Sequence, residues 1–250
     1  MRKNHYTTLL LDYGGTLDTN ARHWAHVLWD GYRHCHVPVT ESQFREAYVF
    51  GERALAKSPV IVSTDNFLNL LCKKVELETG YLQQQSYWAV TEEERRTKSD
   101  MIAQFCYAYA RQHVEQSKQV LQLLNTEYRL LLVTNFYGNI KAVLKDFGLD
   151  GLFQSVIESA VVGVRKPDPA IWALGMKADG ADADEIIAVG DSVSKDIEPA
   201  KQLGFHTIWM QGQGWDNKEV LSDASDMVIH DIRELPEAVC QLQEVKFQTE

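Results

Sequence analysis

Short apolar runs recur along the chain, and over much of its length they alternate with segments of helical periodicity. The first run covers residues 7–11 and stops at a polar residue, Asp12. Apolar runs of four to eight residues bounded by turn signals are typical of strands buried on both faces. Later runs of this kind are YRLLLVTN ending at Asn135, SVIESAVV over residues 155–162, EIIAVGDS ending at Ser192, FHTIWM ending at Met210 and SDMVIH ending at His230.

Helical patterns lie between these later strands. We expect helices over residues 139–147, 168–177 and 194–203. Strands that alternate with helices require right-handed crossovers, which favour a parallel sheet. The fold class predicted for this part of the chain is therefore α/β, with a Rossmann-like, doubly wound parallel sheet.

The segment between Asn20 and about residue 125 has a different pattern, because no comparable strand appears in it. Apolar residues recur at helical spacing, and TESQF at residues 40–44 and TEEE at residues 91–94 have the form of capping boxes. A further helix contains Phe67, with Gly80 as its expected end. We therefore predict a helical cap domain at residues 20–114, inserted into a core formed by residues 1–19 and 115–250.

Composition and charge narrow the function classes. The 250 residues are 45% hydrophobic and 24% charged, with a formal net charge of −10 and no block of basic residues. Nucleic-acid binding is not expected, because it needs a basic surface. The apolar run near the N-terminus is too short for a signal peptide and no segment is long enough to span a bilayer, so we expect a cytoplasmic protein without a membrane partner. The four scattered cysteines are expected to be reduced.

Polar groups suited to a metal ion or a phosphoryl anion stand at or after several strand ends. Asp12 and Asp191 could converge on Mg²⁺, which prefers a few carboxylate oxygens and several waters. A carboxylate held beside such an ion can attack phosphorus and form an acyl phosphate. The carboxyl ends of the strands are where sheets of this type bind ligands.

Three further positions could complete such a site. Thr134 offers a hydroxyl and Asn135 an amide to phosphoryl oxygens, and Lys166 offers a positive charge. Asp196, one turn into the next helix, could bond the lysine or a metal-bound water. Each position also has an ordinary reading as a cap or turn residue, but the joint occurrence at strand ends makes coincidence improbable.

Four stretches together resemble the motifs of the haloacid dehalogenase-like (HAD-like) hydrolases, in the order of that family. They are LLLDYGGTL, LLVTN, VRKPDPAIW and IIAVGDSVSKDIEPAKQLG. The resemblance covers about residues 5–18 and 115–235, and the helical insertion is similar to the family's cap domain in position and helical character. It implies a Rossmann-like core and a mobile cap that closes over the site.

The resemblance implies roles for the matching residues. Asp12 would be the nucleophile and a Mg²⁺ ligand, and Lys166 the catalytic lysine. Thr134 and Asn135 would bind the phosphoryl group together with Lys166, and Asp191 would ligate Mg²⁺.

The remaining implied roles concern the surroundings of the ion. The backbone carbonyl of Gly14 would be a further ligand, while Thr16, Ser192 and Asp196 would support the ligand set. The expected substrate is a small phosphorylated metabolite, because a cap limits substrate size.

Position 14 departs from the family pattern. Phosphatases of the family carry an aspartate there, which protonates the leaving oxygen and later deprotonates water, whereas this chain has Gly14. Loss of a general acid–base group commonly lowers a rate by about 10² to 10⁴. Asp18 is not an obvious substitute, and His23 and His26 are candidates for a replacement acid.

Four readings of Gly14 stay open. The first is a Mg²⁺-dependent phosphatase that is slow or prefers good leaving groups. The second is a non-catalytic member that binds a phosphorylated ligand or a partner. The third resembles the phosphonate-cleaving branch, which forms a Schiff base on a cap lysine, for which Lys57 is the candidate. The fourth is a dehalogenase, although Asp191 argues against it. Arg53 is the candidate cap residue facing the pocket.

Overall fold

The computed structural model describes residues 6–58, 60–215, 223 and 225–249. Within this part of the chain, six parallel strands form one sheet in the order β3-β2-β1-β4-β5-β6. Their bounds are β1 Thr8–Leu11, β2 Arg129–Thr134, β3 Ser155–Glu158, β4 Ile186–Gly190, β5 His206–Met210 and β6 Met227–Ile229. The predicted α/β class with a doubly wound parallel sheet is confirmed.

Helices cover both faces of the sheet because neighbouring strand residues point to opposite sides. Leu10 faces a core with Trp172 of α7 (Ala170–Asp179) and Ala200 of α8 (Glu198–Gln202). Leu9 and Leu11 face the other core, to which α5 (Ile140–Asp146) and α9 (Leu235–Thr249) contribute. Burial on both faces explains why the strands read as continuous apolar runs.

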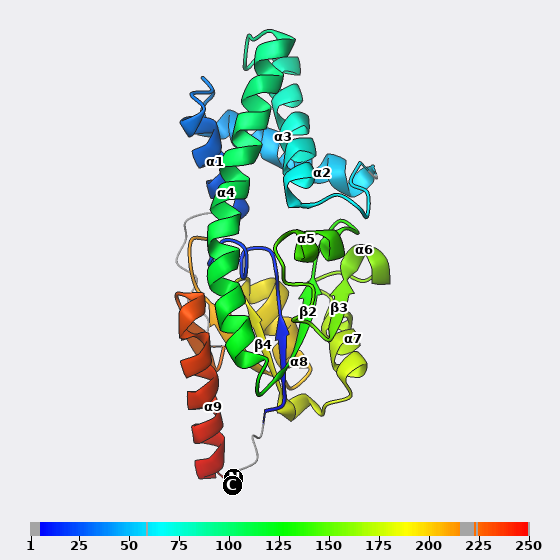
Figure 1. Ribbon diagram of the computed structural model, residues 1–250, viewed down its shortest axis with the longest axis vertical. Helices are drawn as coiled ribbons and strands as arrows, with labels where there is room; N and C mark the ends of the chain where they lie inside the picture. The colour runs from blue at the N-terminus through cyan, green and yellow to red at the C-terminus, as the bar shows by residue number, and fades with distance from the viewer. Residues whose placement is uncertain (1–5, 59, 216–222, 224, 250) are drawn as a thin grey trace.

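Four helices lie between β1 and β2 in the part of the chain that the structure describes. They are α1 Trp24–His34, α2 Glu41–Lys57, α3 Phe67–Gln84 and α4 Glu92–Leu124. Figure 1 shows them above the carboxyl ends of the strands, with α4 running from the top of the insertion down beside the sheet and α9. The division predicted between residues 114 and 115 therefore falls inside one continuous helix. Ser117 of α4 donates a hydrogen bond of 2.7 Å to the Leu17 carbonyl, which ties this helix to the segment after β1.

Local sequence signals set several element ends. The Thr40 hydroxyl accepts from the Gln43 backbone while the Gln43 side chain accepts from the Thr40 backbone, so the predicted capping box is present. Thr91 caps α4 through Glu94 N. The prediction that Gly80 ends its helix is wrong, because α3 continues to Gln84.

The remaining elements are short and complete the α/β core. The stretch SVIESAVV divides into β3 and a short helix, α6 Ser159–Val162, and does not form a single strand. The predicted helix over residues 194–203 begins as a π-helical turn, η2 Val193–Ile197, and continues as α8. Two short 3₁₀ turns are η1 Ala183–Glu185 and η3 Ile232–Glu234.

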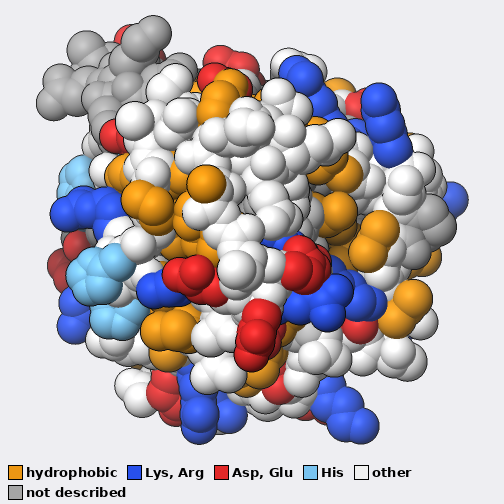
Figure 2. All heavy atoms as spheres, turned by 90° about the horizontal axis from the view of Figure 1, so that it is seen from above, with side chains coloured by type: hydrophobic (Ala, Val, Ile, Leu, Met, Phe, Trp, Pro, Cys, Tyr) orange, Lys and Arg blue, Asp and Glu red, His pale blue; other side chains and the backbone are white. Residues whose placement is uncertain are grey.

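Seen from the insertion end, the surface carries acidic and basic side chains side by side, with hydrophobic side chains in small separate groups (Figure 2). Cys35, Cys72, Cys106 and Cys240 are all free thiols, as expected. Among the described helices, none combines the length and apolar character needed to cross a bilayer.

Candidate active site

The centre of the candidate site is the point where the strand order reverses. β1 lies between β2 and β4, and the chain moves outward from it first in one direction and then in the other. Such a reversal leaves a crevice at the carboxyl ends of the strands, where open α/β sheets bind ligands. Asp12 follows β1 directly and Asp191 follows β4 directly, so register pairing of β1 with β4 brings the two carboxylates together.

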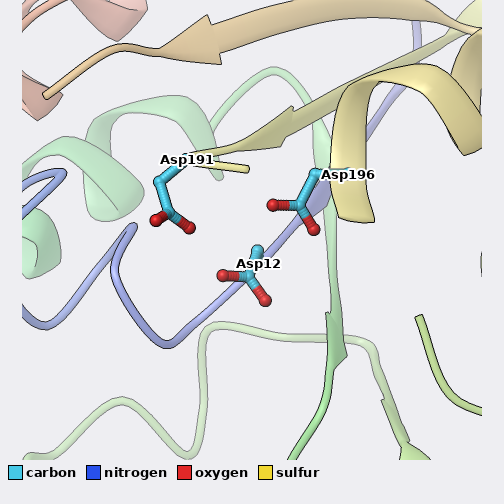
Figure 3. A group of neighbouring side chains, drawn as sticks. All are labelled: Asp12, Asp191 and Asp196. Carbon is cyan, nitrogen blue, oxygen red and sulfur yellow. The ribbon is translucent and has the colours of Figure 1, made fainter. Parts of the chain in front are cut away.

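Three carboxylates meet in this crevice. One oxygen from each of Asp12, Asp191 and Asp196 lies within 4.8 Å of the others. Figure 3 shows the three side chains turned toward a common space, from the end of β1, the end of β4 and the turn after β4. The expected convergence of Asp12 and Asp191 is present in the structure.

Lys166 lies between two of these carboxylates. Its ammonium donates to Asp12 Oδ1 at 2.6 Å and to Asp196 Oδ1 at 2.7 Å, and the side chain is buried. Burial alone would lower the pKa of Lys166, but the two carboxylates outweigh it and the pKa is raised. The lysine is therefore a fixed positive charge beside Asp12.

One lysine does not balance three carboxylates, of which Asp12 and Asp196 are buried and Asp191 is partly buried. Burial raises the pKa of Asp12 to about 6, although Lys166 opposes the shift. Burial, then the charges of Asp196 and Asp12, hold the pKa of Asp191 well above its ordinary range. A cluster with this excess of negative charge matches the donor set that a divalent cation requires, and the cation would relieve the repulsion.

The segment after Asp12 is shaped to fit against Asp191. The Thr16 hydroxyl lies 3.2 Å from Asp12 Oδ2 and 3.3 Å from Asp191 Oδ1, bridging the two carboxylates. Gly15 has a φ of +96°, and a Cβ there would lie 2.5 Å from Asp191 Oδ2. Only glycine therefore permits this close approach.

The two residues after β2 have different surroundings. Thr134 is buried, and its hydroxyl has no hydrogen-bond partner among the described residues. Asn135 instead uses its amide on the Lys166 main chain, accepting from Lys166 N at 2.9 Å and donating to Lys166 O at 3.1 Å. The structure thus gives Asn135 a positioning contact, whereas its predicted contact with phosphate stays a prediction.

The turn after β4 fixes Asp196. Ser192 N donates to Asp196 Oδ2 at 2.9 Å, so both oxygens of this carboxylate are held, one by the backbone and one by Lys166. The Trp209 indole donates to the Asp191 carbonyl at 2.9 Å. The contact of Ser192 with Asp196 is made by its backbone N–H and not by its hydroxyl. A supporting role for the Ser192 side chain stays a prediction.

Gly14 is exposed at the mouth of the site, and a Cβ there would meet no atom within 4 Å. Asp18, by contrast, is fully buried and accepts from Gly15 N at 2.7 Å and from the Trp24 indole at 2.9 Å. Burial raises the pKa of Asp18 to about 7.

A single cavity of about 980 Å³ joins the acidic cluster to the inserted helices. Arg53 and Lys57 are exposed and do not line it, so the structure does not bring these two predicted residues to the site. His23 does line it, whereas His26 bonds the Gly214 carbonyl at 2.8 Å and does not.

Among the described residues of the insertion, Lys74 and Glu52 are the charged ones that line the cavity, and neither is among the predicted site residues. Lys74 is buried and pairs with Glu52, to which the Tyr137 hydroxyl also donates. A signal was present, because Lys74 stands on the apolar stripe that Leu70 and Leu71 begin in α3. A lysine within such a stripe is rarely buried unless it is paired.

Comparison with models of protein families matches residues 6–204 to the haloacid dehalogenase-like hydrolases. The chain belongs to this family. The resemblance drawn from the four motifs is thereby confirmed for the family as a whole. HAD-like hydrolases generally use Mg²⁺, which agrees with the acidic cluster.

Curated relatives of this HAD-like chain include several phosphatases. A glyceraldehyde 3-phosphate phosphatase of Pyrococcus abyssi is 37% identical over 108 residues, which is 42% of this chain and 44% of the relative. A phosphoserine phosphatase of Thermus thermophilus is 31% identical over 42% of both chains. A phosphoglycolate phosphatase of Pseudomonas syringae is 30% identical over 52% of this chain and 50% of the relative. The chain thus spans about half, or less, of the length of each of these relatives.

Solved structures share the HAD-like fold over nearly the whole chain. A HAD-hydrolase from Bacillus subtilis, bound to magnesium, has a TM-score of 0.60 at 21% identity and covers 94% of this chain and 99% of its own. A dehalogenase has a TM-score of 0.61 at 17% identity and covers 94% and 97%. At such identities these structures bear on the fold alone.

Proposed function

We propose that this protein is a Mg²⁺-dependent hydrolase of small organic phosphates, with Asp12 as the nucleophile. The observation that carries the proposal is the group formed by Asp12, Asp191 and Lys166 at the strand-order reversal, in which Asp12 and Lys166 are buried and Asp191 is partly buried. The phosphatase relatives agree with this reaction.

The donor set is suited to Mg²⁺. Asp12 and Asp191 would hold the ion, together with the exposed main chain at Gly14, while Thr16 keeps the two carboxylates in register. When bound, Mg²⁺ supplies charge neutralisation for the nucleophile and the phosphoryl oxygens.

Asp12 is oriented for attack by contacts to both of its oxygens. Lys166 holds Oδ1 and Thr16 contacts Oδ2. The first step forms a bond from an Asp12 oxygen to phosphorus and breaks the bond from phosphorus to the leaving alcohol. Water then attacks phosphorus and the bond from phosphorus to the Asp12 oxygen breaks, so that inorganic phosphate leaves with the protons of the water and the Asp12 carboxylate is restored.

Two residues would bind the phosphoryl group during these steps. The unpartnered hydroxyl of Thr134 is free to donate to a phosphoryl oxygen, and Lys166 supplies positive charge where negative charge develops. Asn135 contributes by holding the Lys166 backbone.

Protonation of the leaving alcohol is the step that Gly14 cannot perform. His23 lines the cavity, but burial lowers its pKa to about 4, so its ring is neutral near pH 7 and has no extra proton to donate. We therefore infer a preference for leaving groups that need little protonation, such as aryl and acyl phosphates.

The three other readings of Gly14 are a Schiff-base enzyme, a dehalogenase and a non-catalytic binding protein, and the contacts in the cavity support them to different degrees. Schiff-base chemistry needs a neutral amine, yet Lys57 lies outside the cavity, and Lys74 has a raised pKa because Glu52 outweighs its burial. The dehalogenase reading lacks a role for Asp191. A non-catalytic, phosphate-binding protein is the second candidate, and the absent side chain at Gly14 is the observation in its favour.

Turnover of an aryl phosphate tests the proposal directly. With Mg²⁺ and p-nitrophenyl phosphate, we expect Asp12→Asn to lower kcat by about 10³ or more, because the substitution removes the nucleophile. Asp150→Asn, an exposed aspartate remote from the cluster, is the matched control and should retain the wild-type rate. Tight binding of tungstate without any turnover would establish the binding protein instead.

A further inference from the structure

The inserted side of the cavity differs in chemistry from the acidic side. Aromatic rings gather there: His23, Trp24, Tyr48 and Phe67 come from the insertion, whereas Phe136 and Tyr137 come from the segment after β2 and Trp215 from the segment after β5. Trp24, Tyr137 and Trp215 are only partly buried, so they are not simply core residues. A wall of this kind offers flat apolar surfaces to a ligand.

The rings are held in place by contacts with one another and with Arg45, which lies outside the cavity. Trp215 has its centroid 5.3 Å from those of both Tyr48 and His23. Arg45 lies 4.8 Å from the Trp215 ring and donates to its carbonyl at 3.2 Å. Because the rings are fixed before a ligand arrives, binding would cost little side-chain ordering.

The charged pair within this lining is internally neutral. Lys74 pairs with Glu52, lies 4.4 Å from the Tyr48 ring, and is buried. The pair leaves no unopposed charge in the insertion's share of the lining, so this part of the cavity suits an uncharged group, whereas the cationic residue Lys195 lines the cavity from the turn after β4. The pair does offer an ammonium donor next to a carboxylate acceptor, which suits a neutral group with an acceptor beside a donor.

We propose that the substrate is the phosphate monoester of an uncharged alcohol or phenol that carries a planar ring, with the ring against Tyr48 and Trp215 and its polar edge at the Lys74–Glu52 pair. This inference rests on the proposed phosphatase function and names its substrate class. It differs from a site for small acidic or aldehyde-bearing phosphates, which would leave most of the 980 Å³ cavity unfilled.

Matched substrates test the ring preference. Benzyl phosphate and cyclohexylmethyl phosphate have similar size and leaving groups, but only the first is planar. We expect kcat/KM to favour benzyl phosphate by about tenfold, as a specific ring contact is worth a factor of that order. Equal rates for the two, or faster turnover of phosphoglycolate, would overturn the proposal while leaving the phosphatase function intact.

A cavity variant and a control variant locate the preference. Trp215→Leu should reduce the benzyl-to-cyclohexylmethyl ratio to near one. Phe50→Leu removes a ring from the outer side of the same insertion, where it stacks on Tyr81, and should keep the wild-type ratio. A ratio that falls equally in both variants would contradict a specific ring site.

The polar edge has its own test. A pyridone-methyl phosphate presents an acceptor beside a donor, and we expect it to exceed benzyl phosphate about tenfold in kcat/KM. The double variant Lys74→Met with Glu52→Gln, which removes both charges together, should abolish this advantage. An advantage that persists in the double variant would exclude the pair as the recognition element.

Calorimetric binding separates this inference from the proposed reaction. Asp12→Asn protein, with Mg²⁺ present, should bind benzyl phosphate about tenfold more tightly than cyclohexylmethyl phosphate. That result would support the ring site even if no phosphate ester were turned over, which would disprove the hydrolase. Equal affinities would disprove the ring site whether or not p-nitrophenyl phosphate is hydrolysed.

Discussion

Two adjacent glycines after Asp12 meet opposite physical demands. Gly15 has a left-handed backbone and lies against the Asp191 carboxylate, so a side chain has no room there. Gly14 faces open space, and its φ is not in the left-handed region. Packing against Asp191 therefore requires glycine at position 15. At position 14 there is room for a side chain, and glycine there only means that a proton-transferring group is missing.

Gly14→Asp is therefore expected to fold and to supply the missing proton donor. We expect kcat for benzyl phosphate, whose leaving group needs protonation, to rise by between about tenfold and 10⁴-fold. The gain should be smaller for p-nitrophenyl phosphate, because its leaving group needs little help. Steady-state kinetics on both substrates measure the difference.

Gly15→Ala serves as the contrasting variant. The added methyl group would displace Asp191, so we expect turnover to fall with both substrates. An unchanged rate in Gly14→Asp for both leaving groups would show that the rest of the site is not competent for catalysis, which favours the binding protein.

At the scale of elements, the end of β4 packs so tightly against the following turn that no side chain fits between them. Gly190 ends β4, and a Cβ there would lie 2.4 Å from the Asp196 Cβ. Asp196 in turn holds Lys166, which holds Asp12. The packing at the end of β4 thus affects the position of Asp12 through two ionic contacts, from Asp196 to Lys166 and from Lys166 to Asp12.

Gly190→Ala tests this linkage. Overpacking of this kind commonly costs about 1–3 kcal/mol, and displacement of Asp196 should also lower kcat. Urea unfolding and p-nitrophenyl phosphate turnover measure the two effects. Gly151→Ala, at an open position, should change neither, and a Gly190→Ala protein with wild-type stability and rate would refute the linkage.

Over the whole molecule, buried carboxyl groups make stability depend on pH. Burial raises the pKa of Glu78 and of Asp18 to about 7, from ordinary values of 4.5 and 3.8. Each group therefore keeps its proton in the folded protein where the unfolded chain has lost it. The stability that each contributes is present at low pH and is lost as the pH rises through about 7.

We expect these two groups to lower the unfolding free energy as the pH rises from about 4 to about 7, by at most about 1.4 kcal/mol per pH unit for each group, and to add little further slope above about 7. Within the same window His23, whose pKa is lowered to about 4 by burial, contributes in the opposite direction. Glu78→Gln should flatten the slope, whereas Glu115→Gln, at an exposed position of α4, should not. An unchanged slope in Glu78→Gln would contradict this account.

Local signals in the sequence identified much of the core. The strands were legible because burial on both faces makes them continuous apolar runs, and Asp12 and Asp191 stood out because polar residues end those runs. The helix α3 continues through Gly80, contrary to the prediction, because contacts between α3 and α4 outweigh the weak helix propensity of glycine.

Other features depend on contacts between distant segments, which periodicity does not encode. The partner of Asn135 is the backbone 31 residues later, and the predicted boundary at residue 114 fell within a helix that belongs to both the insertion and the core. Residue type alone favours Arg53 and Lys57, whereas the cavity receives Glu52 and Lys74 from the same insertion.

The sequence by itself determined the α/β class, the place of the helical insertion and the residues that end the central strands. Each of these follows from the local periodicity of apolar residues and from the polar residues that end the apolar runs. Only the tertiary structure decided which insertion residues face those strand ends and which charges neutralise one another there. The reason is geometric: the rotation of each helix about its axis, and its height above the sheet, are set by packing against partners far away in the chain.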